Sequence, residues 1–381
     1  MIAGSAKLDI TPHSPNHLAG YANRDHPHEG VHDPLSIRAL YVSNGSQELA
    51  LVSADILWFR EEVLEPIHKL IEQELGIAPE YVMLCGTHTH SAPTTSGPNV
   101  NKEYLHFPST QTLAAVSLAK NRAQPAFLSV SRGTSQIGIN RREQKPTGEV
   151  VLGENPDGPI DREIILIAVA TDSGTVAEVC GFATHGTVMG GDNYLISGDW
   201  CGIAAAEVEG SGGTFLFMNG GAANVNPRGR ISRPSAFEIA ETLAKEFVGD
   251  IEDARKTTTE LDGDETLSGK FVDIELPRKL RDIEDGMGHT RRVRIHGIRL
   301  GPVRILGFPG EVFSQTSMAV KAAFPSKVVA VNSYTSGGSA GYVAVKEAFD
   351  TGGYEVRVSP YSEDAEAVLR SEFIKLAKAL E

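Results

Sequence analysis

The sequence predicts an α/β fold, in the broad sense that includes α+β, with a mixed β-sheet core flanked by helices. Apolar stretches alternate between the two-residue period of strands and the 3.6-residue period of helices. One strand–helix–strand unit implies parallel strands, and a polar loop between two later strands implies an antiparallel pair. With no internal repeat, residues 1–381 are predicted to form a single large domain with its functional residues at strand ends.

The first half of the chain contains the strand–helix–strand unit and the hairpin. The unit comprises a strand over residues 47–55, an amphipathic helix over 61–75 and a strand over 81–85, and both strands should be buried. A helix over 110–121, a strand over 126–132 and two strands over 163–170 and 175–183 follow. Turn-forming residues 171–174 join the last two as a hairpin, so the sheet is expected to be mixed.

The second half continues the alternation and contains one surface excursion. Its predicted helices span residues 199–209, 235–247, 315–324 and 364–379, and its predicted strands span 214–218, 270–276, 293–300, 303–308 and 327–331. The acidic, threonine-rich stretch 249–269 is predicted to be a surface excursion.

Composition and charge narrow the class of partner. Hydrophobic residues make up 41% of the chain and charged residues 22%, which suffices for a folded core. The net charge of −14 is spread along the sequence, which argues against nucleic acid or an anionic membrane surface as a partner. We expect a small neutral or cationic molecule as the substrate.

Targeting signals and cysteines favour the cytoplasm. Residues 1–10 lack a charged segment followed by an apolar one, and no run approaches the roughly 18 apolar residues of a membrane span. Cys85, Cys180 and Cys201 form no C-x-x-C pair and fit a reducing compartment. We expect a cytoplasmic protein with no integral membrane association, and leave open whether it forms a homo-oligomer.

Two histidines at alternate positions follow the predicted strand 81–85. Residues 85–93 read C-G-T-H-T-H-S-A-P, and His88 and His90 should point to the same side of an extended segment. Imidazole is the commonest metal ligand, so this pair can converge on one metal ion or one substrate. A pair of hydrogen-bonded surface histidines is the alternative.

His185 and Glu311 also stand where predicted strands end. His185 opens an H-G-T segment whose glycine permits close backbone approach. Glu311 follows a Pro-Gly pair, where a carboxylate can complete a zinc site or act as a general base. Taken alone, each residue is more typical of a structural position.

Two glycine-containing segments resemble known catalytic or phosphate-binding motifs but lack a residue that each motif needs. Residues 337–341 match G-x-S-x-G, but that elbow needs a histidine after the serine and none follows His296, so Ser339 is not expected to be a nucleophile. The segment 217–228 lacks the P-loop lysine, and its asparagines are expected to line a pocket or fix turns.

Together, the motifs resemble the catalytic domain of the neutral, non-lysosomal ceramidase family, whose members are secreted or membrane-attached zinc amidases. The resemblance extends from near the N-terminus to about Pro360. It rests on segments that occur in one order along the chain: residues 20–22, 30–32, 52–55, 86–91, 139–141, 185–187, 196–199 and 309–311.

The resemblance implies a zinc ion held by four side chains. His88 and His185 correspond to the family's histidine ligands, and Glu311 and a tyrosine complete the set. The family's tyrosine-rich stretch favours Tyr342 as the fourth ligand, with Tyr334 as the runner-up.

The resemblance also assigns residues around the metal. His90 and Arg141 are placed on the substrate side, where they would bind the acyl carbonyl and stabilise its developing oxyanion. Tyr334, Asn226 and His32 are predicted to line the substrate site, with local turn bonding as the alternative for His32.

Asp55 and Asp199 are predicted to orient the ligand histidines as hydrogen-bond acceptors, with helix capping as the alternative.

The sequence departs from the family in two ways. Asn226 replaces a serine proposed as a nucleophile in the family, so direct attack by zinc-activated water is the mechanism that these residues support. The chain also ends without the family's C-terminal immunoglobulin-like domain, so we expect a short form. The reaction type therefore transfers more safely than the substrate.

We expect a zinc-dependent hydrolase that cleaves an amide bond, with a small soluble amide or acyl molecule as the substrate. Ceramide or another N-acyl lipid is the next candidate. A zinc esterase or deacetylase, and a zinc-binding scaffold without catalysis, are the remaining alternatives.

Overall fold

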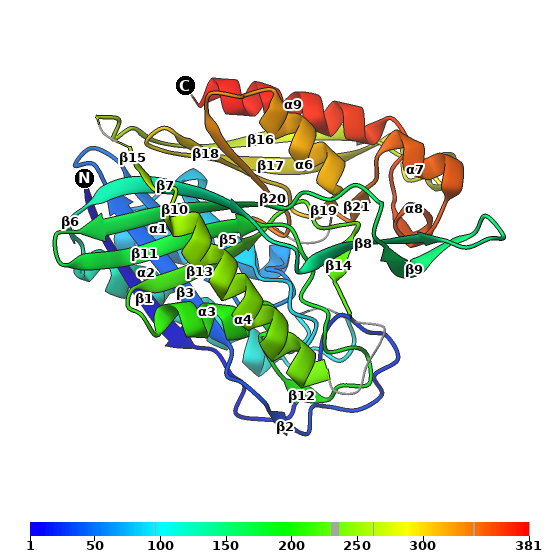
Figure 1. The fold of residues 1–381 in the computed structure, drawn as a ribbon, viewed down its shortest axis with the longest axis horizontal. Coiled ribbons are helices and arrows are strands. Elements are labelled where there is room, and N and C mark those ends of the chain that lie inside the picture. Colours follow the sequence, from blue (N-terminus) through cyan, green and yellow to red (C-terminus); the bar gives the residue numbers. More distant parts are fainter. Residues whose placement is uncertain (96, 230–235, 262, 338–339, 381) are drawn as a thin grey trace.

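Three β-sheets surround one shared hydrophobic core (Figure 1). The computed structural model describes residues 1–381 except 96, 230–235, 262, 338–339 and 381. Leu51, Ile167 and Ile305, one from each sheet, are all at most 1% exposed and belong to the same core cluster. The sheets therefore pack face to face on a common interior.

The strands are divided among the three main sheets as follows. The first sheet has the order β5 (Val82–Gly86), β4 (Glu48–Ala54), β3 (Ser36–Ser43), β1 (Ile2–Asp9) and β6 (Gln124–Pro125). The second has the order β13 (Thr214–Asn219), β11 (Gly174–Phe182), β10 (Glu163–Thr171), β7 (Phe127–Thr134) and β15 (Thr259–Glu260). The third has the order β16 (Leu267–Pro277), β17 (Thr290–Leu300), β18 (Val303–Gly307) and β20 (Val328–Asn332).

A pair of helices packs against the outer face of each sheet. The pairs are α1 (Glu61–Leu75) with α2 (Lys102–Asn121), α3 (Asp199–Glu209) with α4 (Ala236–Arg255), and α6 (Ser314–Ala322) with α9 (Ala365–Ala379). None of the described helices is both long enough and apolar enough to cross a membrane.

Short elements connect the layers and carry several site residues. The small sheets are β2 (Gly30–Val31) with β12 (Leu195–Ile196), β14 (Val225–Pro227) with β8 (Gly138–Gln144) and β9 (Val150–Asn155), and β19 (Glu311–Val312) with β21 (Tyr342–Val343). The short helices are η1 (Pro79–Tyr81), α5 (Leu280–Glu284), α7 (Lys346–Thr351) and α8 (Tyr354–Val358).

The α/β class and the mixed pairing are confirmed. β4 and β5 are parallel and joined by α1, which has the predicted bounds and ends at Gly76 with φ 75°. β10 and β11 form the predicted antiparallel hairpin, closed by the pair Thr171 and Gly174. The order of strands across three sheets was beyond the sequence patterns, because pairing partners lie far apart in the chain.

Two predicted helix boundaries are wrong by more than one turn. α2 starts at Lys102 instead of residue 110. The Asn101 side chain caps this start by accepting hydrogen bonds from the backbone amides of Glu103 and Tyr104. α4 continues to Arg255, so the first residues of the predicted excursion 249–269 are helical. Ile251 and Ala254 extend the buried face of α4, at 0% and 1% exposure.

Candidate metal centre

The H-T-H and H-G-T segments lie side by side at the ends of β5 and β11. Thr89 and Gly186 form a parallel bridge, and the His90 amide donates to the Gly186 carbonyl at 3.0 Å. A Cβ atom on Gly186 would lie 3.0 Å from the His88 carbonyl oxygen. Glycine therefore lets the segments approach until the His88 and His185 ring centroids are 4.9 Å apart.

Three histidines form a cluster that could hold a metal ion. One potential ligand nitrogen from each of His88, His90 and His185 lies within 4.8 Å of the other two. The Nε2 atoms of His88 and His90 are 3.1 Å apart. His88 and His185 are 1% exposed and His90 is partly buried, so the cluster is largely shielded from solvent.

Backbone carbonyls select the histidine tautomers that suit metal binding. The Nδ1 atom of His88 lies 3.0 Å from the Leu57 carbonyl, and that of His185 lies 2.9 Å from the Ala222 carbonyl. A carbonyl only accepts, so both Nδ1 atoms carry the proton and both Nε2 atoms present an unprotonated lone pair, as a metal ligand must. Burial lowers the pKa of His88 to about 3, which keeps its ring neutral.

Glu311 adds a carboxylate to the cluster. Its Oε2 atom lies 3.2 Å from His185 Nε2 and accepts a hydrogen bond from the Tyr334 hydroxyl at 3.0 Å. Burial raises the pKa of Glu311, although His88 and Arg141 oppose the rise. The two ring nitrogens and this carboxylate are the donor types that zinc and similar divalent ions bind, so the residues fit a metal ion.

Two tyrosines converge on Glu311. The Tyr334 ring stacks on His88 with centroids 3.6 Å apart, and its hydroxyl is 3.4 Å from His185 Nε2. Tyr342 is the register partner of Glu311 where β19 pairs with β21. Both phenols lie where they could contact a metal ion, and the assignment of Tyr342 ahead of Tyr334 stays a prediction.

Arg141 approaches the cluster from β8 and is 4% exposed. Its Nη1 atom is 3.3 Å from His185 Nε2, and its Nε donates to Glu355 at 2.7 Å. Burial acts to lower its pKa, but Tyr342, Glu355 and Glu311 together raise it, so the guanidinium stays charged. The Nη2 atom is buried and has no hydrogen-bond partner among the described residues. A donor is therefore available to a bound acceptor.

The sequence interpretation missed Glu355 and Tyr354. Glu355 is fully buried and bonds both Arg141 and Arg142, at 2.7 and 2.6 Å. Burial acts to raise its pKa, but these arginines outweigh that effect and the pKa is lowered. Tyr354 packs its ring 5.7 Å from that of Tyr342 and 5.8 Å from the Arg141 guanidinium. The Tyr-Glu pair beside a tyrosine-rich stretch was the one available signal.

The N-terminal segment covers His90. A Cβ atom on Gly20, which has φ 88°, would fall 2.3 Å from His90 Nδ1, so only glycine fits this approach. Arg24 donates to the His90 carbonyl at 2.6 Å and to the Ala19 carbonyl at 2.7 Å. The Tyr21 ring meets His90 edge-on at 5.1 Å. The resemblance motif at residues 20–22 therefore builds one wall of the site.

The prediction that Asp55 and Asp199 accept hydrogen bonds from His88 and His185 is wrong. Asp55 accepts from the Ser36 amide and pairs with Arg38 at 2.8 Å, and Asp199 accepts from the amides of residues 188 and 189. Backbone carbonyls accept the Nδ1 protons of His88 and His185 instead. Asp199, with φ 56°, shapes the turn after His185 from a distance.

Three residues considered in the sequence analysis remain: His32, Asn226 and Ser339. His32 stacks on Phe237 at 4.0 Å and bonds Asp33 at 2.8 Å, and these contacts match the alternative of local turn bonding. Asn226 lies on β14 next to β8, is 4% exposed, and its Oδ1 has no hydrogen-bond partner within the described chain. Ser339 lies outside the described residues.

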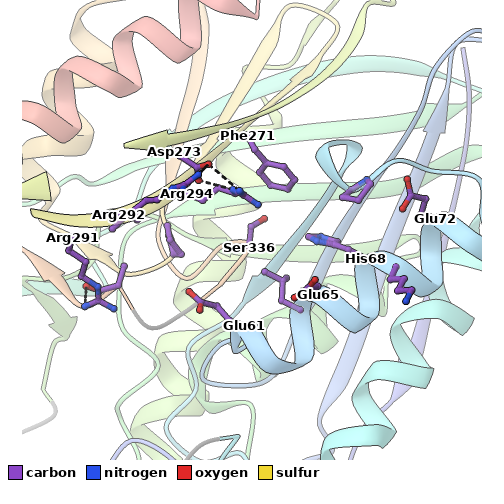
Figure 2. Close-up of a pocket in the computed structure, with 16 residues that line it drawn as sticks. Glu61, Glu65, His68, Glu72, Phe271, Asp273, Arg291, Arg292, Arg294 and Ser336 are labelled. Atoms are coloured by element: carbon purple, nitrogen blue, oxygen red, sulfur yellow. Dashed lines mark hydrogen bonds and ion pairs between the residues drawn. The ribbon is translucent and has the colours of Figure 1, made fainter. Parts of the chain in front are cut away.

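A separate cavity of about 700 Å³ lies between α1 and the β16–β17 hairpin (Figure 2). Its wall includes Glu65 and His68 on one side and Arg294 on the other, with Ser336 between them. None of the three clustered histidines lines it. Ser336, which lines this cavity, follows Tyr334 by two residues in the same loop.

A buried histidine cluster with a carboxylate and an arginine at strand ends is a candidate metal site in an α/β protein. The sequence model of the family described as "Neutral/alkaline non-lysosomal ceramidase, N-terminal" matches residues 1–220. The chain belongs to this family.

Known relatives agree with that membership. The chain is 27% identical over 225 residues to a neutral ceramidase from Oryza sativa subsp. japonica, covering 55% of this chain and 28% of that protein. It is 26% identical over 230 residues to one from Mycobacterium tuberculosis, covering 53% of this chain and 34% of that protein. The matched region thus spans about a third of the length of these relatives.

A solved structure shows the same fold across the whole chain. The crystal structure of neutral ceramidase from Pseudomonas aeruginosa superposes with a TM-score of 0.85 at 19% identity, covering 100% of this chain and 74% of that one. A structure described as a ceramidase complexed with C2 gives the same TM-score at 18% identity.

Proposed function

We propose that the protein is a zinc-dependent amidohydrolase that cleaves an N-acyl bond in a small soluble substrate. One observation carries the proposal: the ligand nitrogens of His88 and His185 converge beside Glu311, with Arg141 on the same side. Family membership supports amide chemistry, because the similar proteins are named neutral ceramidases.

Zinc is the ion that best fits these donors. Neutral imidazoles and a carboxylate, each oriented by a further hydrogen bond, are typical of catalytic zinc sites. His88, His185, Glu311 and Tyr342 would hold the ion, with Tyr334 as the alternative fourth ligand. When bound, zinc supplies a Lewis acid that polarises a carbonyl and lowers the pKa of water to about 7.

Arg141 would bind the oxygen on which negative charge develops. Its guanidinium is fixed by Glu355, buried, and provides an Nη2 donor without a partner in the described structure. A preorganised donor of this kind stabilises an oxyanion more strongly in a buried site than in water. His90, partly buried beside His88, would exchange a proton with the leaving amine.

Asn226 supports direct hydrolysis without a covalent intermediate. An amide side chain is no nucleophile, and Asn226 lies on β14, beside the strand that carries Arg141. Its buried Oδ1 can accept a hydrogen bond from a substrate N–H.

Ceramide or another N-acyl lipid is the second candidate substrate, favoured by the names of the relatives. The small soluble substrate is favoured by the buried cluster and by the N-terminal wall built from Gly20 and Arg24 over His90. A narrow site admits a short acyl group more readily than two alkyl chains.

A substrate panel tests the proposal. Purified protein would be stripped with a chelator, reloaded with Zn²⁺, and assayed on N-acetyl and longer N-acyl amines, on ceramide in detergent, and on matched esters. We expect zinc-restored hydrolysis of short N-acyl amines and about a 10²-fold or greater loss in His185→Ala. Full activity of metal-free protein would refute zinc catalysis, and metal-loaded protein inert on every substrate would favour a scaffold.

A further inference from the structure

The loop after β20 holds a tyrosine of the metal centre in strained backbone. Tyr334 and Ser336 adopt φ angles of 58° and 48°. Left-handed conformations are strained for non-glycine residues, and they persist only where surrounding contacts impose them. This conformation directs the Tyr334 ring onto His88 and its hydroxyl onto Glu311.

Ser336 is held in place by a buried histidine that is remote from the metal centre. The Ser336 hydroxyl lies 2.7 Å from His296 Nδ1, and His296 Nε2 lies 2.9 Å from the Glu80 carbonyl. Because that carbonyl only accepts, Nε2 carries the proton, and Nδ1 must accept from the Ser336 hydroxyl. His296 is 0% exposed, and burial lowers its pKa to about 3, so the neutral tautomer persists.

The hydrogen-bonded chain is anchored to rigid elements at both ends. His296 lies in the long hairpin strand β17 and packs its ring 4.3 Å from that of Phe271 on β16. Glu80 belongs to η1, directly before β5, and the Ser336 amide donates to Leu84 of β5 at 2.7 Å. The loop is thus fixed against the strand whose end presents His88.

We propose that His296 and Ser336 are positioning residues that hold Tyr334 against Glu311 and His88. The catalytic consequence rests on the proposed function, whereas the placement of Tyr334 does not. Ser336 also lines the cavity of Figure 2, whose lining includes none of the three clustered histidines.

A matched set of variants separates this role from general stability. Ser336→Ala removes the hydroxyl donor. His296→Asn keeps an acceptor near the position of Nδ1 but loses the Glu80 bond, whereas His296→Gln keeps a donor near Nε2 but loses the Ser336 bond. His68→Gln is the control, because His68 is a similarly buried histidine whose bond goes to the Val82 carbonyl and not to the loop.

Crystal structures and zinc affinities of these variants are the decisive readouts. In Ser336→Ala and His296→Gln we expect the Tyr334 hydroxyl to leave Glu311, the zinc dissociation constant to rise about 10-fold or more, and kcat to fall by a similar factor at nearly constant KM. His296→Asn and His68→Gln should keep the wild-type Tyr334 position and zinc affinity even where they melt earlier.

An unmoved Tyr334 hydroxyl with wild-type zinc affinity in Ser336→Ala would overturn the proposal. The crystallographic readout does not depend on turnover. A wild type without amidase activity would refute the proposed function, and the position of Tyr334 in the variants would still decide the positioning role.

Discussion

Glu355→Gln tests whether a buried carboxylate holds Arg141 in its working position. Glu355 is 0% exposed and bonds Arg141 at 2.7 Å and Arg142 at 2.6 Å. The substitution keeps the shape but removes the charge, which leaves the Arg141 guanidinium uncompensated in a buried site. Breaking a buried pair costs about 3–5 kcal/mol. Glutamine retains one acceptor, so we expect about 3 kcal/mol less stability in urea unfolding.

The catalytic effect should exceed what the loss of folded protein explains. A displaced oxyanion donor lowers kcat by about 10²-fold, measured below the urea transition where the variant is folded. Glu178→Gln is the control, because Glu178 pairs with Arg255 at 2.6 Å on another sheet and Arg255 is 34% exposed. The control should lose less stability than Glu355→Gln and keep kcat, because Arg255 remains accessible to water. A wild-type kcat in folded Glu355→Gln would show that Glu355 does not hold Arg141 in its catalytic position.

Three further predictions concern stability and packing. Burial lowers the pKa values of His68, His88 and His296 to about 4, 3 and 3 from an unfolded value of 6.5, so the unfolded state binds more protons below pH 6.5. The free energy of unfolding of metal-free protein should therefore fall as the pH decreases from about 6.5 to 4, by at most about 4 kcal/mol per pH unit. Urea titrations that show no change in this free energy between pH 6.5 and 5 would contradict the prediction. Gly186→Ala should separate the two histidine segments and weaken zinc binding about 10-fold in chelator competition, because its Cβ would lie 3.0 Å from the His88 carbonyl oxygen. Gly249→Ala meets no atom within 4 Å inside α4 and should raise the unfolding free energy by about 0.5–1 kcal/mol, whereas a loss would contradict the helical assignment.

The parts of the site that follow strand ends were accessible from sequence. His88 and His185 each follow a buried strand, and the glycine after His185 signals close backbone approach. Strand-end placement is a local property, so a pattern of apolar residues followed by histidine carries it. Glu311 was also a strand-end candidate, and the family resemblance favoured it and added Arg141; the structure brings both to the same cluster.

Contacts between distant segments were not accessible. Glu355 lies 214 residues from Arg141 and reaches it only because α8 packs beside β8 and β9. The acceptors for the histidine Nδ1 atoms are backbone carbonyls, which any residue supplies, so sequence pointed to Asp55 and Asp199 instead. No sequence pattern encodes which carbonyl a loop will present.

The end of α4 shows how composition can mask periodicity. Residues 249–255 are rich in acidic side chains and read as surface, yet Ile251 and Ala254 continue the buried stripe that includes Phe247. Glu252 and Asp253 occupy the exposed face of the same helix. Spacing was the better guide here, because a surface helix needs only one apolar stripe.

Anomalous diffraction at the zinc absorption edge tests whether the cluster of His88, His185 and Glu311 binds zinc. Crystals of zinc-reloaded wild type and of His88→Ala and His185→Ala would be measured above and below the edge. We expect one zinc peak per chain, within bonding distance of His88, His185 and Glu311, which is lost or strongly reduced in both variants. A wild-type chain with no peak in this cluster, or a peak that persists unchanged in both variants, would contradict it.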